Sequence, residues 1–175
     1  MKHVNAADYA ETIVKALPRG VLLTTKAEKV NAMVIGWGAL GVEWGKPVFC
    51  AYVRESRFTR AQLDANPEFT VNVPLGEVDA NILRVCGAQS GRDIDKIKET
   101  GLTPVPGEAV SVPGLREFPL TLECRVVFRQ KQDIERIDAK FHAFYPQSAP
   151  GDGSAPVRDA HIAYYGEIVN AYIAE

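Results

Sequence analysis

Cysteine is scarce in this sequence, because only Cys50, Cys86 and Cys124 occur among its 175 residues. No two of them form a CxxC pair, so neither a zinc knuckle nor a dithiol redox motif is indicated. We expect all three to pack as small core residues. The chain therefore needs no disulfide or metal to hold it together.

Long apolar runs are missing as well. The first seventeen residues, MKHVNAADYAETIVKAL, include acidic side chains and no continuous hydrophobic stretch. They match neither a signal peptide nor a membrane span. Together with the unpaired cysteines, this predicts a reducing, cytoplasmic location and no membrane partner.

The chain also lacks an excess of positive charge: 20 basic and 22 acidic side chains give a formal net charge of −2. A protein that follows nucleic-acid phosphates without reading sequence needs a broad electropositive surface. We therefore expect no nucleic-acid partner. The basic residues that do cluster, at 54–60 and 92–98, suit one small phosphate better than a polymer.

Two nucleotide-binding fingerprints are absent. The run GAQSGRD, residues 87–93, lacks the GxxxxGK[ST] spacing of a P-loop, and no GxGxxG follows a predicted strand. A Rossmann domain for NAD is therefore not expected.

What the sequence does contain is a series of short apolar runs typical of strands. They occupy residues 21–25, 32–37, 48–53, 69–73, 120–128 and 161–173. Apolar and polar residues alternate in the run LTLECRVVF, which predicts one buried face. Strands at such close spacing predict a barrel or a sandwich.

A helical pattern lies near the start of the chain. Asn5 can cap a helix from about Ala6 to Leu17, whose apolar residues fall on one face. Pro18 and Gly20 then end it.

Helical spacing recurs at residues 78–100, as an insertion between strands, and at residues 134–144. Residues 146–156, PQSAPGDGSAP, have the composition of a mobile loop. No repeat and no composition break divides the chain. Residues 1–175 are thus expected to form a single domain, mainly β with flanking helices (α+β).

Anion-binding groups gather where the predicted strand at 48–53 ends, in the run RESRFTR. These groups belong to Arg54, Ser56, Arg57 and Thr59. They enter a turn before a short helical run, for which Thr59 can serve as the N-cap. Hydroxyls, guanidinium groups and the free amides of a helix start suit a phosphate monoester. A capped surface helix with solvated arginines explains the same residues, and the spacing alone leaves both open.

A second cluster lies in the run CGAQSGRDIDKIKETG. Ser90 precedes a predicted helix and Asp93 follows three residues later, a spacing close to a capping box. Capping does not explain Gly91. It also leaves Arg92 and Lys96 one turn apart on one helix face, where they can hold an anion.

The glycine-rich run GWGALGVEWGKP predicts a hairpin. In it, Gly36 and Gly38 flank Trp37 directly after the apolar run AMVI. Glycines there either permit positive backbone angles or let a flat ligand approach the chain closely. Turn chemistry alone explains part of the pattern.

Four runs occur in this order: NAMVIGWGALGVEWGKPVFCAYVRESRFTRAQLDANPEFTVNVP, CGAQSGRDIDKIKETGLTPVPGE, LECRVV and DAHIAYYGEI. As an ordered set they resemble the flavin reductase-like family of FMN-binding split barrels, which includes flavoredoxin. The resemblance covers about residues 10–174. It implies a split β-barrel with flanking helices and a homodimer whose subunit interface helps to house FMN.

The resemblance also implies roles for individual residues. The isoalloxazine ring would lie, mainly through backbone contacts, beside Asn31, Ala32, Met33, Val34 and Ile35. The phosphate and the ribityl chain would be held by Arg54, Ser56, Arg57 and Thr59. The residues that would close over them are Ser90, Gly91 and Lys96. No catalytic residue and no metal ligand is assigned, because the flavin carries the hydride and electron transfers.

The last motif of the set contributes His161, Tyr164 and Tyr165, whose role is left open. A lone histidine near tyrosines is most often a hydrogen-bonded core residue. Trp37 and Trp44 are expected to serve packing, although either is large enough to cover a flavin face.

Three functions follow from the resemblance. The first is a flavin reductase that uses NADH or NADPH, or a flavoredoxin-like electron carrier. The missing Rossmann fingerprint does not exclude it, because a nicotinamide can stack directly on an exposed flavin. The second is a non-catalytic protein that stores or passes on FMN. The third is a barrel that has lost the cofactor, and this reading predicts a colourless protein even after incubation with FMN.

Overall fold

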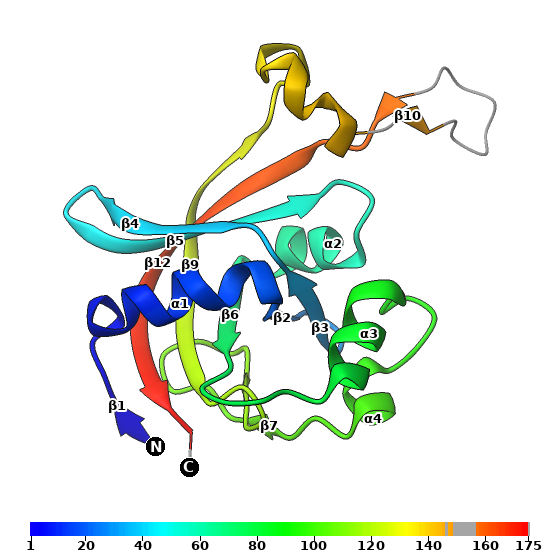
Figure 1. Ribbon diagram of the computed structural model, residues 1–175. Coiled ribbons are helices and arrows are strands. Elements are labelled where there is room, and N and C mark those ends of the chain that lie inside the picture. Colours follow the sequence, from blue (N-terminus) through cyan, green and yellow to red (C-terminus); the bar gives the residue numbers. More distant parts are fainter. Residues whose placement is uncertain (146, 149–156, 175) are drawn as a thin grey trace.

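The computed structural model describes residues 1–145, 147–148 and 157–174 (Figure 1). Most of the loop predicted at 146–156 therefore lies outside the described residues. The strands are β1 (Lys2–His3), β2 (Val21–Lys26), β3 (Val30–Ile35), β4 (Gly38–Glu43), β5 (Lys46–Arg54), β6 (Glu68–Val73), β7 (Pro104–Val105), β8 (Gly114–Leu115), β9 (Leu120–Lys131), β10 (Gln147–Ser148), β11 (Val157–Arg158) and β12 (His161–Ile173).

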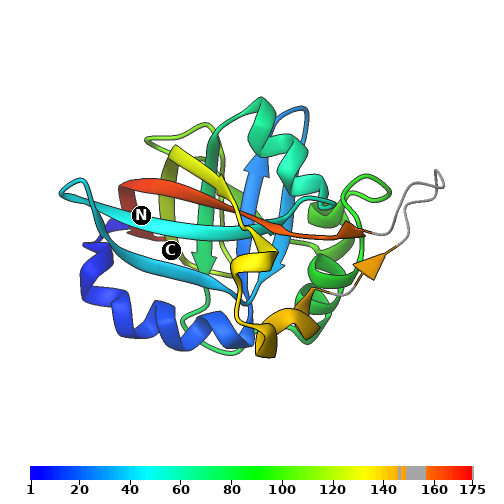
Figure 2. The same cartoon turned by 90° about the horizontal axis from the view of Figure 1, so that it is seen from above.

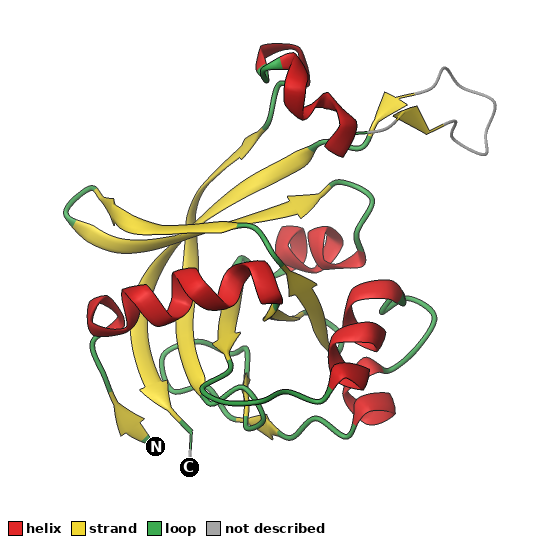
Figure 3. Ribbon diagram, in the orientation of Figure 1, coloured by secondary structure: helices red, strands yellow, loops and turns green. Residues whose placement is uncertain are grey.

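Helical segments flank these strands, as predicted (Figure 3). The α-helices are α1 (Ala10–Ala16), α2 (Phe58–Ala65), α3 (Ala80–Ala88) and α4 (Lys96–Thr100). The 3₁₀ segments are η1 (Ala6–Tyr9), η2 (Leu17–Arg19), η3 (Ile134–Arg136) and η4 (Ala139–Phe144).

The main sheet is antiparallel, with the strand order β3-β2-β6-β9-β12-β5-β4, and β1 pairs with the end of β12. β3 and β4 lie at opposite edges of this sheet, although only Gly36 and Trp37 separate them in the chain. So short a connection spans at most about 11 Å. The sheet must therefore curl until its two edges come close, as the view from above shows (Figure 2). The result is an open barrel, which confirms the predicted split β-barrel.

β9 and β12 form the long central pair of the sheet. Alternation along β9 predicted one buried face, and Leu120, Leu122 and Cys124 do lie in the main core. Thr121 and Glu123, on the other face, are fully buried too. The prediction of a single buried face is wrong here, because the connector before β9 packs over that side: Glu123 accepts hydrogen bonds from the backbone of Glu108 and Ala109.

The helix predicted from Ala6 to Leu17 is present as η1, α1 and η2 in succession. Asn5 caps it, as expected, by accepting a hydrogen bond of 3.0 Å from the amide of Ala7. Ile13 faces the core and is fully buried. Gly20 ends the segment with φ +101°, a backbone angle that side chains rarely tolerate.

The predicted helical insertion at 78–100 contains α3 and α4, which pack against β3. The predicted capping box at Ser90 is wrong, because the second helix begins only at Lys96. Its N-cap is Asp95, whose carboxylate accepts from the amide of Lys98. The residues around Ser90 form a turn instead.

Beyond the barrel, β9 and β12 extend to an arm, which we define as the described residues 132–145 and 157–160 (Figure 1). The helical pattern predicted at 134–144 is realised there as η3 and η4. The three cysteines are buried and free, as expected. In the described part of the chain, no helix has the length and apolar character needed to cross a membrane.

Candidate functional site

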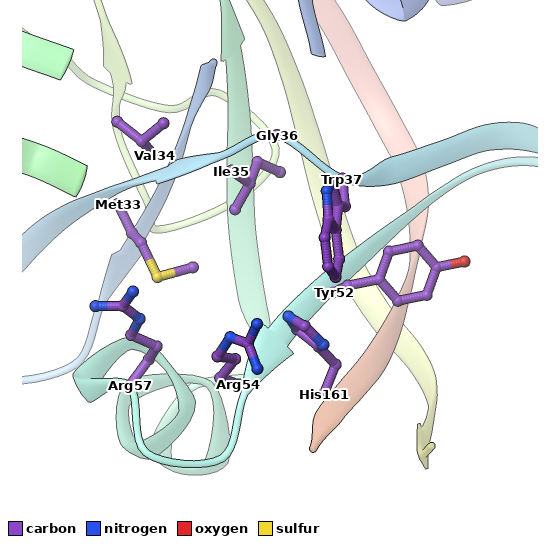
Figure 4. A pocket seen from close by; sticks show the side chains of 9 residues that line it. All are labelled: Met33, Val34, Ile35, Gly36, Trp37, Tyr52, Arg54, Arg57 and His161. Atoms are coloured by element: carbon purple, nitrogen blue, oxygen red, sulfur yellow. The ribbon is translucent and has the colours of Figure 1, made fainter. Parts of the chain in front are cut away.

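Two cavities adjoin at the split of the barrel. The first, of about 170 Å³, is lined by Met33, Val34, Ile35, Gly36, Trp37, Tyr52, Arg54, Arg57 and His161 (Figure 4). The second, of about 130 Å³, is lined by Asn31, Met33, Ser56, Arg57, Phe58, Thr59, Gln89, Ser90, Gly91, Arg92 and Lys96. Met33 and Arg57 line both, so the cavities lie side by side with these two residues between them.

β3 supplies one wall to both cavities. It is an edge strand that pairs only with β2, so its outer backbone groups lie outside the sheet. Within the described part of the chain, the backbone of residues 31–35 makes no hydrogen bond other than those to β2. The side chain of Ala32 is buried beneath α3 and lines neither cavity. Ala32 can therefore reach a ligand only through its backbone.

Trp37 forms the aromatic wall of the first cavity, and Figure 4 shows it on the same side as His161, opposite Met33. Its ring centroid lies 5.0 Å from that of His161 and 5.3 Å from that of Phe144. Trp37 thus packs against the arm, as expected of a packing residue, yet 41% of it remains exposed. Trp44 lies at the tip of the β4–β5 hairpin, outside both cavities.

His161 is buried beside the first cavity with a neutral imidazole. Burial, reinforced by the positive charge of Arg54, lowers its pKa to about 4. Its Nδ1 has no hydrogen-bond partner among the described residues. The expected burial of His161 is confirmed, whereas its ring makes no hydrogen bond with a described residue, contrary to the expected hydrogen-bonded core histidine.

Tyr164 and Tyr165, from the same motif, line neither cavity. Tyr164 is 1% exposed and belongs to the main core, and its hydroxyl has no partner among the described residues. Tyr165 packs on Phe128, with ring centroids 5.2 Å apart. Alternation along β12 separates these two side chains onto opposite faces of the sheet.

Arg54, the last residue of β5, lines the first cavity. Its guanidinium donates to two carbonyl oxygens of the arm, that of Asp159 at 2.9 Å and that of Phe144 at 2.8 Å. Arg54 therefore fastens the arm to the barrel. Its positive charge, which neither carbonyl neutralises, still faces the cavity.

The turn after β5 brings Ser56 and Arg57 to the second cavity. The amide and the hydroxyl of Ser56 both donate to the carboxylate of Asp159, over 3.1 and 2.6 Å. The amide of Arg57 donates to the carbonyl of Arg54 and closes the turn. The guanidinium of Arg57 makes no hydrogen bond or ion pair with any described residue, so its donors are available to a ligand.

Thr59 does not cap α2, contrary to the prediction. The N-cap of α2 is Arg57, two residues earlier than predicted. Thr59 therefore falls within the first helical turn, where it is 1% exposed. Its hydroxyl oxygen accepts a hydrogen bond of 3.2 Å from Nδ2 of Asn31. The other end of that amide, Oδ1, is buried and has no partner among the described residues.

Gly91 closes the second cavity next to Asn31. A Cβ at this position would overlap Oδ1 of Asn31 and would lie 2.8 Å from the ring of Phe58. The glycine is therefore required by close packing. Capping by Ser90 did not explain why residue 91 is a glycine, and this close approach does.

Three cations surround the second cavity. They are Arg57, Arg92 and Lys96, and no acidic residue is among its lining residues. Arg92 donates to the carbonyl of Ser56 over 3.2 Å. Lys96 is 4% exposed, its Nζ donates to the carbonyl of Cys86 at 2.9 Å, and burial lowers its pKa. A small anion would offset the desolvation of this lysine.

Sequence reasoning missed Tyr52, Phe58 and Gln89 as lining residues of these cavities. Tyr52 had a usable signal, since it precedes Arg54 by two positions on a strand and so shares its face. Phe58 and Gln89 had none, because they reach the cavity through the packing of α2 and of the turn after α3 on β3.

Comparison with known proteins gives a consistent result. A profile of the family described as "Flavin reductase like domain" matches residues 14–175. A relative from Archaeoglobus fulgidus, described as an uncharacterized protein, is 30% identical over 109 residues. That match spans 62% of this chain and 60% of the relative's length.

Two solved structures illustrate the similarity in fold. A flavoredoxin from Methanosarcina acetivorans has a TM-score of 0.62 and 26% identity, over 89% of this chain and 68% of that one. An FMN-binding domain of a flavin reductases-like enzyme from Shewanella baltica OS155 has a TM-score of 0.65 and 16% identity, over 98% of this chain and 75% of that one. The second likeness supports the fold alone.

Proposed function

Since this chain belongs to the flavin reductase like domain family, we propose that it binds FMN across the two cavities and acts on it as an oxidoreductase. The isoalloxazine ring takes the first cavity and the phosphate takes the second. The ribityl chain passes Met33 and Arg57, which line both. Residues 1–175 work as one domain in this proposal.

The charge of the second cavity carries the proposal. Arg57, Arg92 and Lys96 line a volume of about 130 Å³ that no acidic side chain enters. A phosphate dianion would pair with the free guanidinium of Arg57 and would favour the charged form of buried Lys96. Riboflavin, which has no phosphate, would leave these three cations unpaired.

Two further features fit a flavin. The free outer edge of β3 offers backbone donors and acceptors to the edge of a flat ring. Trp37 and neutral His161 close the opposite side of that cavity.

FMN bound in this way would supply hydride and electron transfer. The residues of the chain bind the flavin, orient it and hold a neutral imidazole close to it, because His161 keeps a pKa of about 4. In the proposed reaction the electron donor would be NADH or NADPH. A reducing compartment such as the cytoplasm belongs to the same proposal, and the three free thiols are compatible with it.

Flavin titration tests the binding. FMN is expected to bind more tightly than riboflavin, measured by the change in flavin fluorescence as protein is added. Equal affinities would contradict the phosphate assignment, and a protein that stays colourless with FMN would overturn the proposal.

Anaerobic mixing with a nicotinamide tests the reaction. If the protein is a reductase, NADH or NADPH bleaches the absorption band of the bound flavin. If the band persists with both donors while FMN remains bound, the protein is an FMN carrier and the reductase assignment fails.

The proposed assembly is a homodimer. An aromatic patch of Trp44, Phe128 and Tyr165 lies on the outer face of the sheet, with Trp44 62% and Phe128 44% exposed. Val42, on the same hairpin as Trp44, is 78% exposed. Apolar surface of this kind favours burial against a second copy of the chain.

A further inference from the structure

One hydrogen-bonded pair beside the second cavity works against the proposed phosphate. The amide of Ser56 donates to Oδ1 of Asp159, and its hydroxyl donates to Oδ2. Serine has one amide hydrogen and one hydroxyl hydrogen to donate. Asp159 takes both, so Ser56 cannot donate to a phosphate while this pair is intact.

The carboxylate of Asp159 forms no ion pair with a described residue. Arg54 lies close by, but its guanidinium donates to the backbone oxygen of Asp159 rather than to the side chain. Neutral donors alone hold the carboxylate. It can therefore exchange Ser56 for water without breaking an ion pair, and the net cost is that of hydrogen bonds from neutral donors to a charged acceptor.

We propose that Asp159 competes with the flavin phosphate for Ser56 and thereby keeps bound FMN exchangeable. The inference rests on the proposed function. When the phosphate enters, it takes the amide and hydroxyl of Ser56, and the displaced carboxylate turns to water. The negative charge left nearby repels the phosphate further, since like charges at short range oppose each other. Both effects weaken FMN and leave riboflavin unaffected.

The arm does not need to unfold for this exchange. Its remaining attachments use backbone oxygens: Arg54 donates to Asp159 and Phe144, and the amide of Glu55 donates to the carbonyl of Ala160 at 3.0 Å. Inside the arm, Arg158 donates to the carbonyl of Tyr145 at 2.8 Å, so this bond is also independent of the Asp159 side chain. Rotation of one side chain is thus enough to free Ser56.

An exchangeable flavin has a functional consequence. A protein that gives up FMN readily can use it as a substrate and release it, whereas a permanent electron carrier gains from tight retention. The pairing of Ser56 with Asp159 therefore favours the reductase over the carrier within the proposed function.

The variant Asp159→Asn tests the competition. Asparagine keeps the shape and one acceptor but carries no charge. We expect the Kd of FMN to fall about tenfold and its dissociation rate to slow by a similar factor, the order of one hydrogen bond to a charged group. The Kd of riboflavin is expected to stay within about twofold. Fluorescence titration and stopped-flow displacement measure these quantities.

The matched control is Glu55→Gln. Glu55 lies in the same turn and pairs with Lys131 at 2.9 Å, but its carboxylate does not contact Ser56. Its removal changes the net charge by the same amount, and we expect less than about a twofold change in FMN affinity, as for other exposed charges. An equal increase in FMN affinity in both variants would show that only the loss of a negative charge matters, and would overturn the role of Asp159.

A second pair of variants links the effect to Ser56. The variant Ser56→Ala lacks the hydroxyl for which the two groups compete. When Asp159→Asn is added to it, the increase in FMN affinity, on a logarithmic scale, is expected to be less than half of that in the wild-type protein. Asp159→Ala, which removes the competitor entirely, serves if the asparagine variant is unstable, and apoprotein melting curves check the folding of each. Weaker or unchanged FMN binding in the Asp159 variants would overturn the inference. Failure of the wild-type protein to bind FMN would instead overturn the proposed function, and this inference with it.

Discussion

Arg57 holds an uncompensated charge at the junction of the two cavities. It is the N-cap residue of α2, yet its side chain makes no capping bond. We predict that Arg57→Ala weakens FMN by about 1.5–3 kcal/mol, the usual contribution of a hydrogen bond to a charged group. Riboflavin binding should stay nearly unchanged, and titration with both flavins measures the difference.

Arg60 provides the control for this prediction. It is on the same helix, but its guanidinium pairs with Asp64 at 2.8 Å. Arg60→Ala removes the same charge at the surface, and its effect on FMN should stay below about 0.5 kcal/mol. If Arg57→Ala weakened the binding of FMN and riboflavin equally, Arg57 would not be a phosphate-binding residue.

His161 links stability to pH. Its pKa is about 4 in the folded protein, against 6.5 ordinarily, chiefly because burial disfavours the charged ring. Between these values the unfolded chain binds a proton that the folded chain does not. The free energy of unfolding therefore falls as pH is lowered from about 6.5 to about 4, and the loss from this group approaches about 3 kcal/mol.

Denaturant unfolding at several pH values checks this prediction against the variant His161→Gln, which cannot titrate. The wild-type protein should lose more stability than the variant between pH 6.5 and 4, and the difference should level off below pH 4. Parallel pH curves for the two proteins would show that His161 takes up its proton at the same pH in the folded and unfolded states, and would contradict the lowered pKa.

The β4–β5 hairpin contains a tight turn at its tip, and its strand β5 contributes Tyr52 and Arg54 to the lining of the first cavity. Its two-residue turn places Trp44 at φ 51° and Gly45 at φ 70°. Such angles match the right-handed twist of paired strands and explain the glycine at position 45. Gly36 and Gly38, which lie nearer the cavity, are not among the glycines with a positive φ, so they need another explanation.

Gly36 and Gly38 differ in what a side chain would meet. A Cβ on Gly36 would lie 3.5 Å from the carbonyl of Leu17, an ordinary contact, and the residue lines the first cavity. A Cβ on Gly38 would lie 2.7 Å from the ring of Phe49. The first glycine leaves room for a ligand, and the second leaves room for the core.

We predict that Gly36→Val and Gly38→Val separate binding from stability. Gly36→Val should lower FMN affinity about tenfold or more, roughly 1.4 kcal/mol, with little change in apoprotein melting. Gly38→Val should lower the free energy of unfolding by about 1–3 kcal/mol through overpacking. Apoprotein melting and FMN titration on each variant give both quantities. A large loss of melting temperature with unchanged affinity in Gly36→Val would show that this glycine serves the chain connection alone.

At the scale of the whole molecule, the split of the barrel determines where the first cavity lies. The two edge strands are joined by two residues, and the first cavity lies along that junction. Backbone groups that a closed barrel would pair remain free along β3. An incomplete barrel therefore supplies both space and hydrogen-bonding groups at one place.

The proposed homodimer gives the whole-molecule prediction. Sedimentation at micromolar concentration should show a dimer, and Phe128→Glu should shift it to the monomer because a charge in the apolar patch opposes burial. Val14→Glu is the control, since Val14 is also exposed, at 55%, but belongs to α1 and is not part of the patch. A wild-type monomer, or dimers unaffected by Phe128→Glu, would contradict the proposed interface.

Much of this architecture follows from local signals in the sequence. Alternating apolar residues predicted β9, a short apolar run predicted β12, and helical spacing with the Asn5 cap predicted the first helix, because a few neighbouring residues suffice for each pattern. The cluster of anion-binding groups after β5 was also visible, and the ordered motifs resembled the family that the comparison then showed. Local backbone preferences and side-chain chemistry were enough for these conclusions.

Only the tertiary structure decided what those groups contact. Ser56 meets Asp159, which lies 103 positions away, and the hydroxyl of Thr59 meets Asn31 inside the barrel rather than capping its helix. Lys96 turns its ammonium group to the carbonyl of Cys86. The physical reason is that a hydrogen bond depends on which strands lie side by side. That pairing is set by the burial of the whole apolar core, and no short stretch of sequence encodes it.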